Sequence, residues 1–553
     1  MNGFRVLRRV LVANRGEIAV RVIRTCRRLG IETVLTVSDA DAASLPARLA
    51  DRVVRIGPAA ASASYLSVDA ITGAAIAVGA DAVHPGYGFL SENARLARAC
   101  AAAGIVFIGP APETLEAAGD KLAARDQAMA AGLPVLPGGH VAPGDIMKFP
   151  EVSGAPAPDT SRNDAIFADD DVPADDAMSA DDAPSAEQVA GRIGYPVLVK
   201  AAGGGGGRGL RVVRDPAELA RAVAVASAEA AAAFGDPRVY LERYVEQGRH
   251  VEVQLLGDGE QVIHLGDRDC SVQRRYQKLI EEAPAPGLDD HLRDRLRNAA
   301  VALGERLRYR GAGTVEFLVD ADSANKSGGE FYFLEVNARI QVEHPVTETL
   351  TGLDIVEEQI AIAEGRPLRI KQADVELAGH AIEVRVNAED PDADFRPSPG
   401  TITRAVFPVG PVPPPRPDHE MSGDVEARSA RHLPTGTAST AGTTGTAGTT
   451  GTASASLIRV DTHLQAGVTV PPYYDSLLAK VIACAPDRGG AIAALRGALD
   501  GCAIDGVTTT LELHRAMLAD AEFAAGGVDT GYLSRWLAHA KQHDLEQGHR
   551  DDG

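Results

Sequence analysis

The chain has 553 residues, with 55 Lys and Arg against 76 Asp and Glu, so its formal net charge is −21, and 45% of its residues are hydrophobic. This acidity argues against a broad nucleic-acid-binding surface, which needs clustered cations, and no apolar run reaches the ~20 residues that span a bilayer. The first residues lack the apolar core of a signal peptide, so we expect a cytoplasmic protein of three or four domains. The five scattered cysteines form no CxxC pair, which favours free thiols over disulfides or a zinc site.

The first ~115 residues predict alternating strands and helices. Apolar runs indicate strands at 10–13, 33–37, 82–84 and 105–108, and periodic patterns indicate helices after Gly16, near 68–78 and near 92–103. In the first helix the apolar residues recur at helical spacing, and Gly30 ends it. Strand, helix, strand at this rhythm predicts a parallel sheet with right-handed crossovers.

Two segments look foreign to a folded core. Residues 141–190 contain 12 acidic and 2 basic residues without sustained periodicity, and residues 435–456 contain only Thr, Gly, Ala and Ser. Neither can bury enough apolar area to offset its ordering entropy, so we expect two disordered surface insertions, the second spanning about 421–456. A regulatory or partner-docking role is the alternative to inert insertions. The charged tail from about 541 is expected to fray.

A strand at 197–200 delivers Lys200 into a run of five glycines, 203–207, and a second strand follows at 209–213. Glycines let backbone N–H groups approach phosphate oxygens, and a lysine adds a point charge to the same phosphates. The spacing fits neither the Walker pattern nor GxGxxG. A flexible linker is the alternative, but linkers are rarely framed by two apolar strands.

Two carboxylates, Glu316 and Glu335, each lie within an otherwise apolar strand, and Asn337 shares a strand face with Glu335. Two carboxylates and an amide oxygen facing one space suit Mg²⁺ or another hard divalent cation, although a buried ion pair with arginine is possible. If the following segment is extended, Arg339, Gln341 and Glu343 share one face. Such a set could hold a small oxyanion and remove its proton.

At this point the sequence resembles the biotin carboxylase subunit or domain of the biotin-dependent acyl-CoA carboxylases, which are ATP-grasp enzymes. The resemblance covers about residues 5–140 and 190–535. It rests on long motifs in the family's order: ANRGEIAVR (13–21), HPGYGFLSEN (84–93), GDK (119–121), the glycine run, RDCSVQRR (268–275), EEAPAP (281–286), NARIQVEHPVTE (337–348), RVNAEDP (385–391) and PPYYDSLLAK (471–480).

The resemblance implies an α/β fold, α+β in its C-terminal part. It implies a Rossmann-like domain at 1–120 and an ATP-grasp domain at 121–365, which includes a glycine-loop lid at about 135–245. A C-terminal domain would follow at 366–540.

The resemblance also implies the roles of individual residues. ATP would be bound by Lys121, Lys200, Gly203, Gly204, Gly205, Gly206, Gly207, Glu242, Val245, His250 and Gln273. Bicarbonate would be held by Lys278, Arg339, Gln341, the Val342 backbone and Glu343, with Glu343 as its base. Magnesium or manganese would be held by Glu316, Glu335 and Asn337, and biotin would face Tyr87 and Arg385. The catalytic set is therefore Lys278, Arg339, Glu343 and Arg385.

The implied reaction is an ATP-dependent ligation in which carboxyphosphate forms and N1′ of biotin is carboxylated, the first half-reaction of an acetyl- or propionyl-CoA carboxylase that serves fatty acid biosynthesis. No Ala-Met-Lys-Met-like turn occurs, so the biotin carboxyl carrier protein and the carboxyltransferase are expected on separate chains. A homodimer through the helix carrying Arg21 and Arg24 is also implied. Tyr276 stands where many relatives have His, which leaves any imidazole contact there in doubt.

Two other functions stay open. The chain could be another ATP-grasp ligase, such as a carbamoyl-phosphate-type or purine-pathway enzyme, since HPGYGFLSEN is partly shared with the former; RVNAEDP and PPYYDSLLAK favour biotin. It could instead be an inactive regulatory subunit, against which the complete set of site residues argues.

Overall fold

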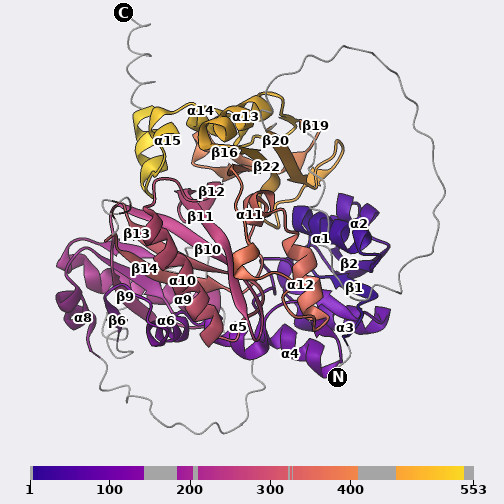
Figure 1. The fold of residues 1–553 in the computed structure, drawn as a ribbon, viewed down its shortest axis with the longest axis horizontal. Helices are drawn as coiled ribbons and strands as arrows, with labels where there is room; N and C mark the ends of the chain where they lie inside the picture. Colours follow the sequence, from indigo (N-terminus) through magenta and orange to yellow (C-terminus); the bar gives the residue numbers. More distant parts are fainter. Residues whose placement is uncertain are drawn as a thin grey trace, which may run out of the picture.

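The computed structural model describes residues 4–141, 184–202, 210–321, 324, 326, 328–408 and 456–540. The predicted glycine loop therefore lies outside the described residues, as do most of the acidic insertion and nearly all of the Thr/Gly-rich one. The arrangement of the described elements is shown in Figure 1, where α13 to α15 lie at the top, α1 and α2 at right, and α3 and α4 below them.

The N-terminal part is a parallel five-stranded sheet of order β3-β2-β1-β4-β5. Its strands are β1 (Arg9–Val12), β2 (Glu32–Ser38), β3 (Arg52–Gly57), β4 (Ala82–His84) and β5 (Val106–Phe107). Its helices are α1 (Gly16–Arg28), α2 (Leu45–Leu49), α3 (Val68–Val78), α4 (Ala94–Ala102) and α5 (Pro112–Gly119). The predicted parallel sheet is confirmed. Strand β3 was missed because most of its side chains are exposed or half-buried and give no apolar run.

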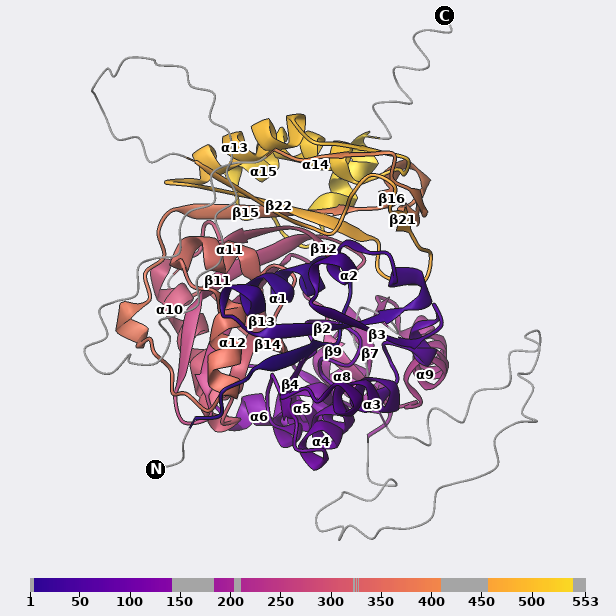
Figure 2. The ribbon, with the colours of Figure 1, turned by 90° about the vertical axis from the view of Figure 1, so that its right-hand side faces the viewer.

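Alternating residues of β1 build the two faces of this sheet. Val10 and Val12 pack with Ile18 and Val22 of α1, whereas Leu11 packs with Ile71 of α3. Figure 2 shows the result, with α1 and α2 on one side of β1 to β3 and α3 and α4 on the other. This doubly wound arrangement places the carboxyl ends of the strands, where ligands bind in such sheets, at one edge.

The centre of the molecule is an eight-stranded antiparallel sheet of order β14-β13-β10-β11-β12-β15-β22-β20. The strands are β10 (Gly248–Asp258), β11 (Val262–Arg274), β12 (Gln277–Ala283), β13 (Arg310–Asp320), β14 (Phe331–Asn337), β15 (His380–Asn387), β20 (Leu457–Thr462) and β22 (Leu477–Ala485). One sheet thus joins the predicted ATP-grasp and C-terminal parts of the chain. The order of the strands along the sequence does not reveal this connection.

Helices pack against the apolar side chains of this sheet. Helix α10 (Asp290–Arg306) packs through Leu292 and Leu296 against Val253 and Phe317 of the sheet. At the other end lie α13 (Arg488–Asp500), α14 (Leu511–Leu518) and α15 (Ala521–Ala525), seen over β15 and β22 in Figure 2. Helices α6 (Lys121–Ala130), α11 (His344–Thr351) and α12 (Ile355–Ala363) complete the central part.

A four-stranded sheet of order β6-β9-β7-β8 carries the two ends of the glycine loop. Its strands are β6 (Gly138–His140), β7 (Val197–Ala201), β8 (Arg211–Val213) and β9 (Val239–Arg243), and α9 (Leu219–Phe234) packs on it. The predicted strands on either side of the loop are confirmed, since β7 and β8 pair antiparallel. Short two-stranded pairs are formed by β16 (Glu389–Asp390) with β17 (Arg396–Pro397), β18 (Gly400–Thr401) with β21 (Thr469–Val470), and β19 (Arg404–Val406) with β23 (Ala503–Asp505).

One predicted boundary is wrong. The acidic insertion was expected to run to residue 190, but α8 (Ala186–Ile193) is a helix that buries Val189 and Ala190. Ser185 and Gln188 form a capping box at its start, which satisfies two backbone N–H groups. The Ser-x-x-Gln spacing was readable in the sequence, but the acidic composition outweighed it.

None of the five cysteines, all within the described ranges, forms a disulfide, as predicted. Across the part of the chain that the structure describes, no helix combines the length and the apolar character that crossing a membrane requires.

Candidate active site

Strand register places a row of charged side chains across the central sheet. Glu335 of β14 is the register partner of Glu316 of β13, Glu316 that of Glu252 of β10, and Glu252 that of Arg268 of β11. Directly opposed residues point to the same face of a sheet, so three carboxylates face one space. Like charges at this spacing repel, and the site therefore requires cations.

Lys278 of β12 supplies one of these cations. Its Nζ lies 2.6 Å from Glu252, 2.7 Å from Glu343 and 3.0 Å from Glu316. Burial favours the neutral amine, but the surrounding negative charges outweigh it, and the pKa of Lys278 is raised well above its usual value. The ammonium is therefore charged at neutral pH and has three carboxylate partners.

Glu343 is fully buried between two cations. Its Oε1 accepts a hydrogen bond from Lys278, and its Oε2 accepts one of 2.9 Å from Nη2 of Arg385 on β15. Burial alone raises the pKa of Glu343, yet the positive charges of Lys278, Arg385 and Arg268 hold it well below 4.5. Glu343 is thus ionised and can accept a proton, and an anion that shared its two cations would raise its pKa and make it a stronger base.

Arg385 joins Glu343 to the adjacent strand. Its Nε donates to Oε1 of Glu281 on β12 at 2.5 Å, while Nη2 reaches Glu343. The guanidinium is therefore held by two carboxylates on different elements, which fixes its plane.

Arg339, Gln341 and Asn337 form a hydrogen-bonded group beside Glu316. Arg339 donates to Oδ1 of Asn337 at 2.8 Å and to Oε1 of Gln341 at 2.7 Å. Asn337 and Gln341 in turn donate to Oε1 of Glu316 at 2.8 and 3.1 Å. The expected extended conformation of this segment is wrong in its second half, because residues 342–343 form the turn that begins α11. The side chains of Arg339, Gln341 and Asn337 nevertheless lie together beside Glu316.

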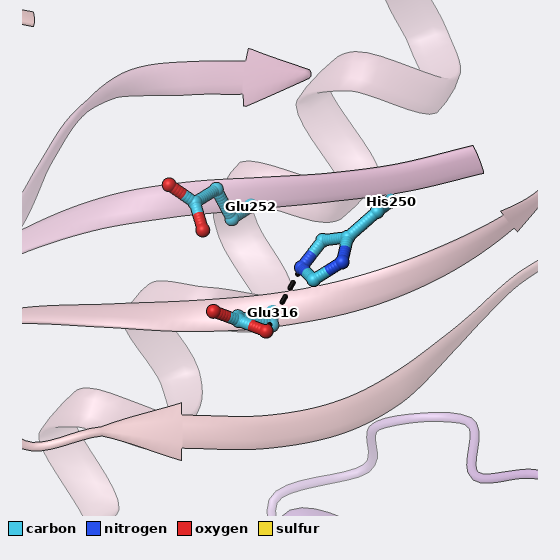
Figure 3. A group of neighbouring side chains, drawn as sticks. All are labelled: His250, Glu252 and Glu316. Carbon is cyan, nitrogen blue, oxygen red and sulfur yellow. Dashed lines mark ion pairs between the residues drawn. The ribbon is translucent and has the colours of Figure 1, made fainter. Parts of the chain in front are cut away.

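The carboxylates at the end of this row fit a divalent cation. The pKa of Glu335 is raised, first by burial and then by the charge of its register partner Glu316. A cation between them would relieve both effects, and carboxylate oxygens are the ligands that Mg²⁺ prefers. Figure 3 shows a second candidate group, in which His250 and Glu252 of β10 face Glu316, and Nε2 of His250 lies 2.8 Å from Glu316.

Several of the described residues expected to bind ATP lie near these carboxylates, whereas residues 203–207 lie outside the described residues. Nζ of Lys200 is 2.5 Å from Glu242 of β9. Lys121 begins α6, where burial lowers its pKa and the charge of Glu335 opposes that shift. Gln273 of β11 is the register partner of Lys278, and Val245 lies half-buried just beyond β9.

Two of the motifs, ANRGEIAVR (13–21) and HPGYGFLSEN (84–93), meet beside the site. Asn14 donates from Nδ2 to the carbonyls of Pro85 and Tyr87, both at 2.7 Å. Gly86 has φ +64°, and a Cβ there would lie 2.9 Å from Asn14 Nδ2, so only glycine allows this contact. The Tyr87 hydroxyl donates to Glu17.

Sequence reasoning missed several members of this network. Glu252 bonds Lys278, Glu281 bonds Arg385, and Glu92 bonds Arg339 through a 3.0 Å contact to Nε. The sequence held weak signals for them, since Glu252 shares a strand face with His250, while Glu281 and Glu92 lie in motifs already singled out. Their partners, however, are brought together only by sheet register and interdomain packing.

Comparison with known proteins identifies the family. Family models match residues 6–115 ("Biotin carboxylase, N-terminal domain"), 159–371 ("Carbamoyl-phosphate synthase L chain, ATP binding domain") and 436–535 ("Biotin carboxylase C-terminal domain"). A biotin carboxylase from Pseudomonas aeruginosa is 43% identical over 537 residues, which are 97% of this chain and 100% of that protein.

Two solved structures are similar over 96% of this chain. The Campylobacter jejuni biotin carboxylase–β,γ-ATP complex has a TM-score of 0.76 at 38% identity and is covered over 99% of its length. The biotin carboxylase domain dimer of Hydrogenobacter thermophilus 2-oxoglutarate carboxylase, in complex with MgADP, ADP and bicarbonate, has a TM-score of 0.78 at 38% identity and is covered over 98%. The resemblance inferred from the motifs is confirmed: this chain belongs to the biotin carboxylase family and is an ATP-dependent carboxylase with an ATP-grasp fold.

Proposed function

We propose that the chain uses ATP and bicarbonate to carboxylate N1′ of biotin on a separate carrier protein. The observation that carries this proposal is the placement of Glu343, an ionised and fully buried carboxylate between the cations Lys278 and Arg385. That arrangement suits a small oxyanion that must be held and deprotonated before it attacks a phosphate.

In the first step, bicarbonate is held by Lys278 and Arg339, with Gln341 and the Val342 backbone beside it. Glu343 takes its proton, and the oxygen that is freed attacks the γ-phosphate of ATP to give carboxyphosphate and ADP. Lys121 and Lys200 offset the charge of the phosphates. Glu316 and Glu335, with Asn337 nearby, would hold Mg²⁺ or Mn²⁺, which when bound neutralises charge that builds up on those oxygens.

In the second step, carboxyphosphate breaks down to CO₂ and phosphate, and the phosphate takes the N1′ proton of biotin. Arg385, held by Glu281 and Glu343, stabilises the enolate that results, which captures the CO₂. Tyr87 lies on the biotin side. Positioning and electrostatics supply most of the rate acceleration, as in other phosphoryl transfers.

The test is ATP cleavage by the purified chain in the presence and absence of bicarbonate and free biotin. The proposal predicts cleavage that requires bicarbonate, rises with biotin and yields carboxybiotin. Cleavage that rises with ammonia but not with biotin would favour the carbamoyl-phosphate-type alternative, and no turnover at all would leave an inactive subunit.

For partners, we propose a carrier protein and a carboxyltransferase on separate chains, and a homodimer. A dimer of a related domain supports the last point. Within α1, Arg24 is exposed, whereas Arg21 is buried in ion pairs with Glu348 at 2.6 Å and Asp354 at 2.7 Å, so Arg24 is the better candidate for a contact between subunits. The final acceptor is proposed to be acetyl- or propionyl-CoA, with a role in fatty acid biosynthesis in the cytoplasm. Isolation of the native complex would identify the chains and the acceptor.

A further inference from the structure

Lys480 is a fully buried cation of β22 to which the steps above give no role. Its Nζ donates a 2.8 Å hydrogen bond to the carbonyl oxygen of Val342 and lies 3.0 Å from Oε1 of Glu17. Val342 immediately precedes the proposed base Glu343. The same Oε1 of Glu17 accepts the hydrogen bond from Tyr87, which lies on the biotin side. The ammonium of Lys480 therefore contacts both the peptide that precedes the proposed base Glu343 and the carboxylate that holds Tyr87.

Burying the ammonium of Lys480 has a free-energy cost that its partners must offset. Its register partner on β15 is Arg385, a second buried cation, and its partner on β20 is Asp461. Removing an ammonium from water and placing it beside another cation is unfavourable unless its own partners compensate. An apolar side chain could fill the position without that cost. What lysine provides and an apolar residue could not are the contacts to Val342 and Glu17.

The contact with Val342 bears directly on the base. Residues 342–343 form the turn before α11, and Glu343, with φ −82° and ψ 10°, lies outside the helix that follows. The peptide between Val342 and Glu343 is therefore not held by the hydrogen bonds of α11, and Lys480 fixes its oxygen from a neighbouring strand. A shift of about 1 Å in a reacting group can cost about 10²-fold in rate.

We propose that Lys480 is a positioning residue for the carboxylation reaction, which sets Glu343 through Val342 and Tyr87 through Glu17. The inference rests on the proposed function, in which Glu343 accepts the proton of bicarbonate and Tyr87 faces biotin. It links an N-terminal helix, α1, and a C-terminal strand, β22, to the base at the start of α11, so the two reacting sides are aligned by one side chain.

The first test is Lys480→Met, which keeps the aliphatic part of the side chain and removes the ammonium. We expect kcat for bicarbonate-dependent ATP cleavage to fall by about 10²-fold and KM for biotin to rise, while KM for MgATP stays at the wild-type value. A merely structural role would lower the melting temperature and leave kcat of the folded enzyme unchanged. Arg310→Met is the matched control, because Arg310 also donates to a main-chain carbonyl, that of Ile362 at 2.7 Å, but at the far end of β13; its kcat should equal the wild-type value.

Lys480→Met leaves the carboxylate of Glu17 buried without its cation, and this could prevent folding. The double variant Glu17→Gln with Lys480→Met removes both charges of the pair, so we expect it to fold while Val342 still lacks its donor. The inference predicts that kcat of the double variant remains about 10²-fold low. Wild-type kcat in a folded Lys480→Met or in the double variant would overturn the inference alone. A wild-type enzyme without bicarbonate-dependent cleavage would overturn the proposed function and, with it, the inference.

Discussion

Replacing Glu343 by Gln tests the residue on which the proposed mechanism depends most. The change keeps the size of the side chain but removes its ability to accept a proton at neutral pH. A positioned base typically contributes about 10²–10⁴-fold, so bicarbonate-dependent ATP cleavage should slow by that factor. At about 1.4 kcal/mol for each tenfold change, this is about 2.8–5.6 kcal/mol of activation free energy.

The structure indicates that the variant will fold. Lys278 retains Glu252 and Glu316, and Arg385 retains Glu281, so neither cation is left without a carboxylate. A glutamine has only one acceptor oxygen, however, while both oxygens of Glu343 now accept hydrogen bonds. One of the two cations will therefore face an amide N–H group, and the melting temperature should fall modestly.

The assay is steady-state ATP turnover across titrations of magnesium and bicarbonate, alongside thermal unfolding. Removing a negative charge beside an anion site should not weaken bicarbonate binding, so KM for bicarbonate should not rise. Glu358→Gln is the control, because Glu358 is also a buried glutamate that pairs with an arginine, Arg369, but it lies on α12 outside the site. If turnover of Glu343→Gln at saturating magnesium equals that of the wild type, Glu343 is not the base. Recovery of the rate only at high magnesium would make it a metal ligand instead.

Three other predictions follow from the same network and from the sequence. Arg385→Ala should preserve reduced bicarbonate-dependent ATP cleavage while carboxybiotin formation collapses, and a normal carboxybiotin yield would remove Arg385 from the second step. Glu383 of β15 is fully buried, neither of its carboxyl oxygens accepts a hydrogen bond from a described residue, and burial raises its pKa well above 4.5. The stability that Glu383 contributes is therefore fully present below its pKa in the unfolded chain and is lost as the pH rises through its pKa in the folded protein. Between about pH 5 and 8 the urea midpoint should consequently fall more for the wild type than for Glu383→Gln. Equal pH dependence of the two proteins would contradict this. Deleting most of 435–456 and rejoining with a short linker should leave activity nearly intact, since each doubling of loop length costs only about 0.6 kcal/mol, and more than tenfold loss would show that the segment is needed.

Much of the secondary structure could be predicted from local patterns in the sequence. The first helix, the strand at 82–84 and the helix at 68–78 were readable, because apolar periodicity and terminal glycines act over a few residues. The family was readable too, since its motifs are long and occur in order. The domain boundaries and the separate roles of the site residues stay predictions, and the glycine loop lies outside the described residues.

The partners of the charged residues were not readable from the sequence. Lys278 meets Glu252 and Glu343 across 26 and 65 positions of the chain, and Lys480 meets Val342 across 138. Such contacts depend on which strands become neighbours and on their register, which are set by the packing of whole layers. The sequence by itself therefore determined which chemical groups are available and in which family they are found. Only the tertiary structure decided that Glu343 lies buried between two cations and that a distant lysine holds the turn before it, because these side chains are brought within bonding distance only when the sheet is complete.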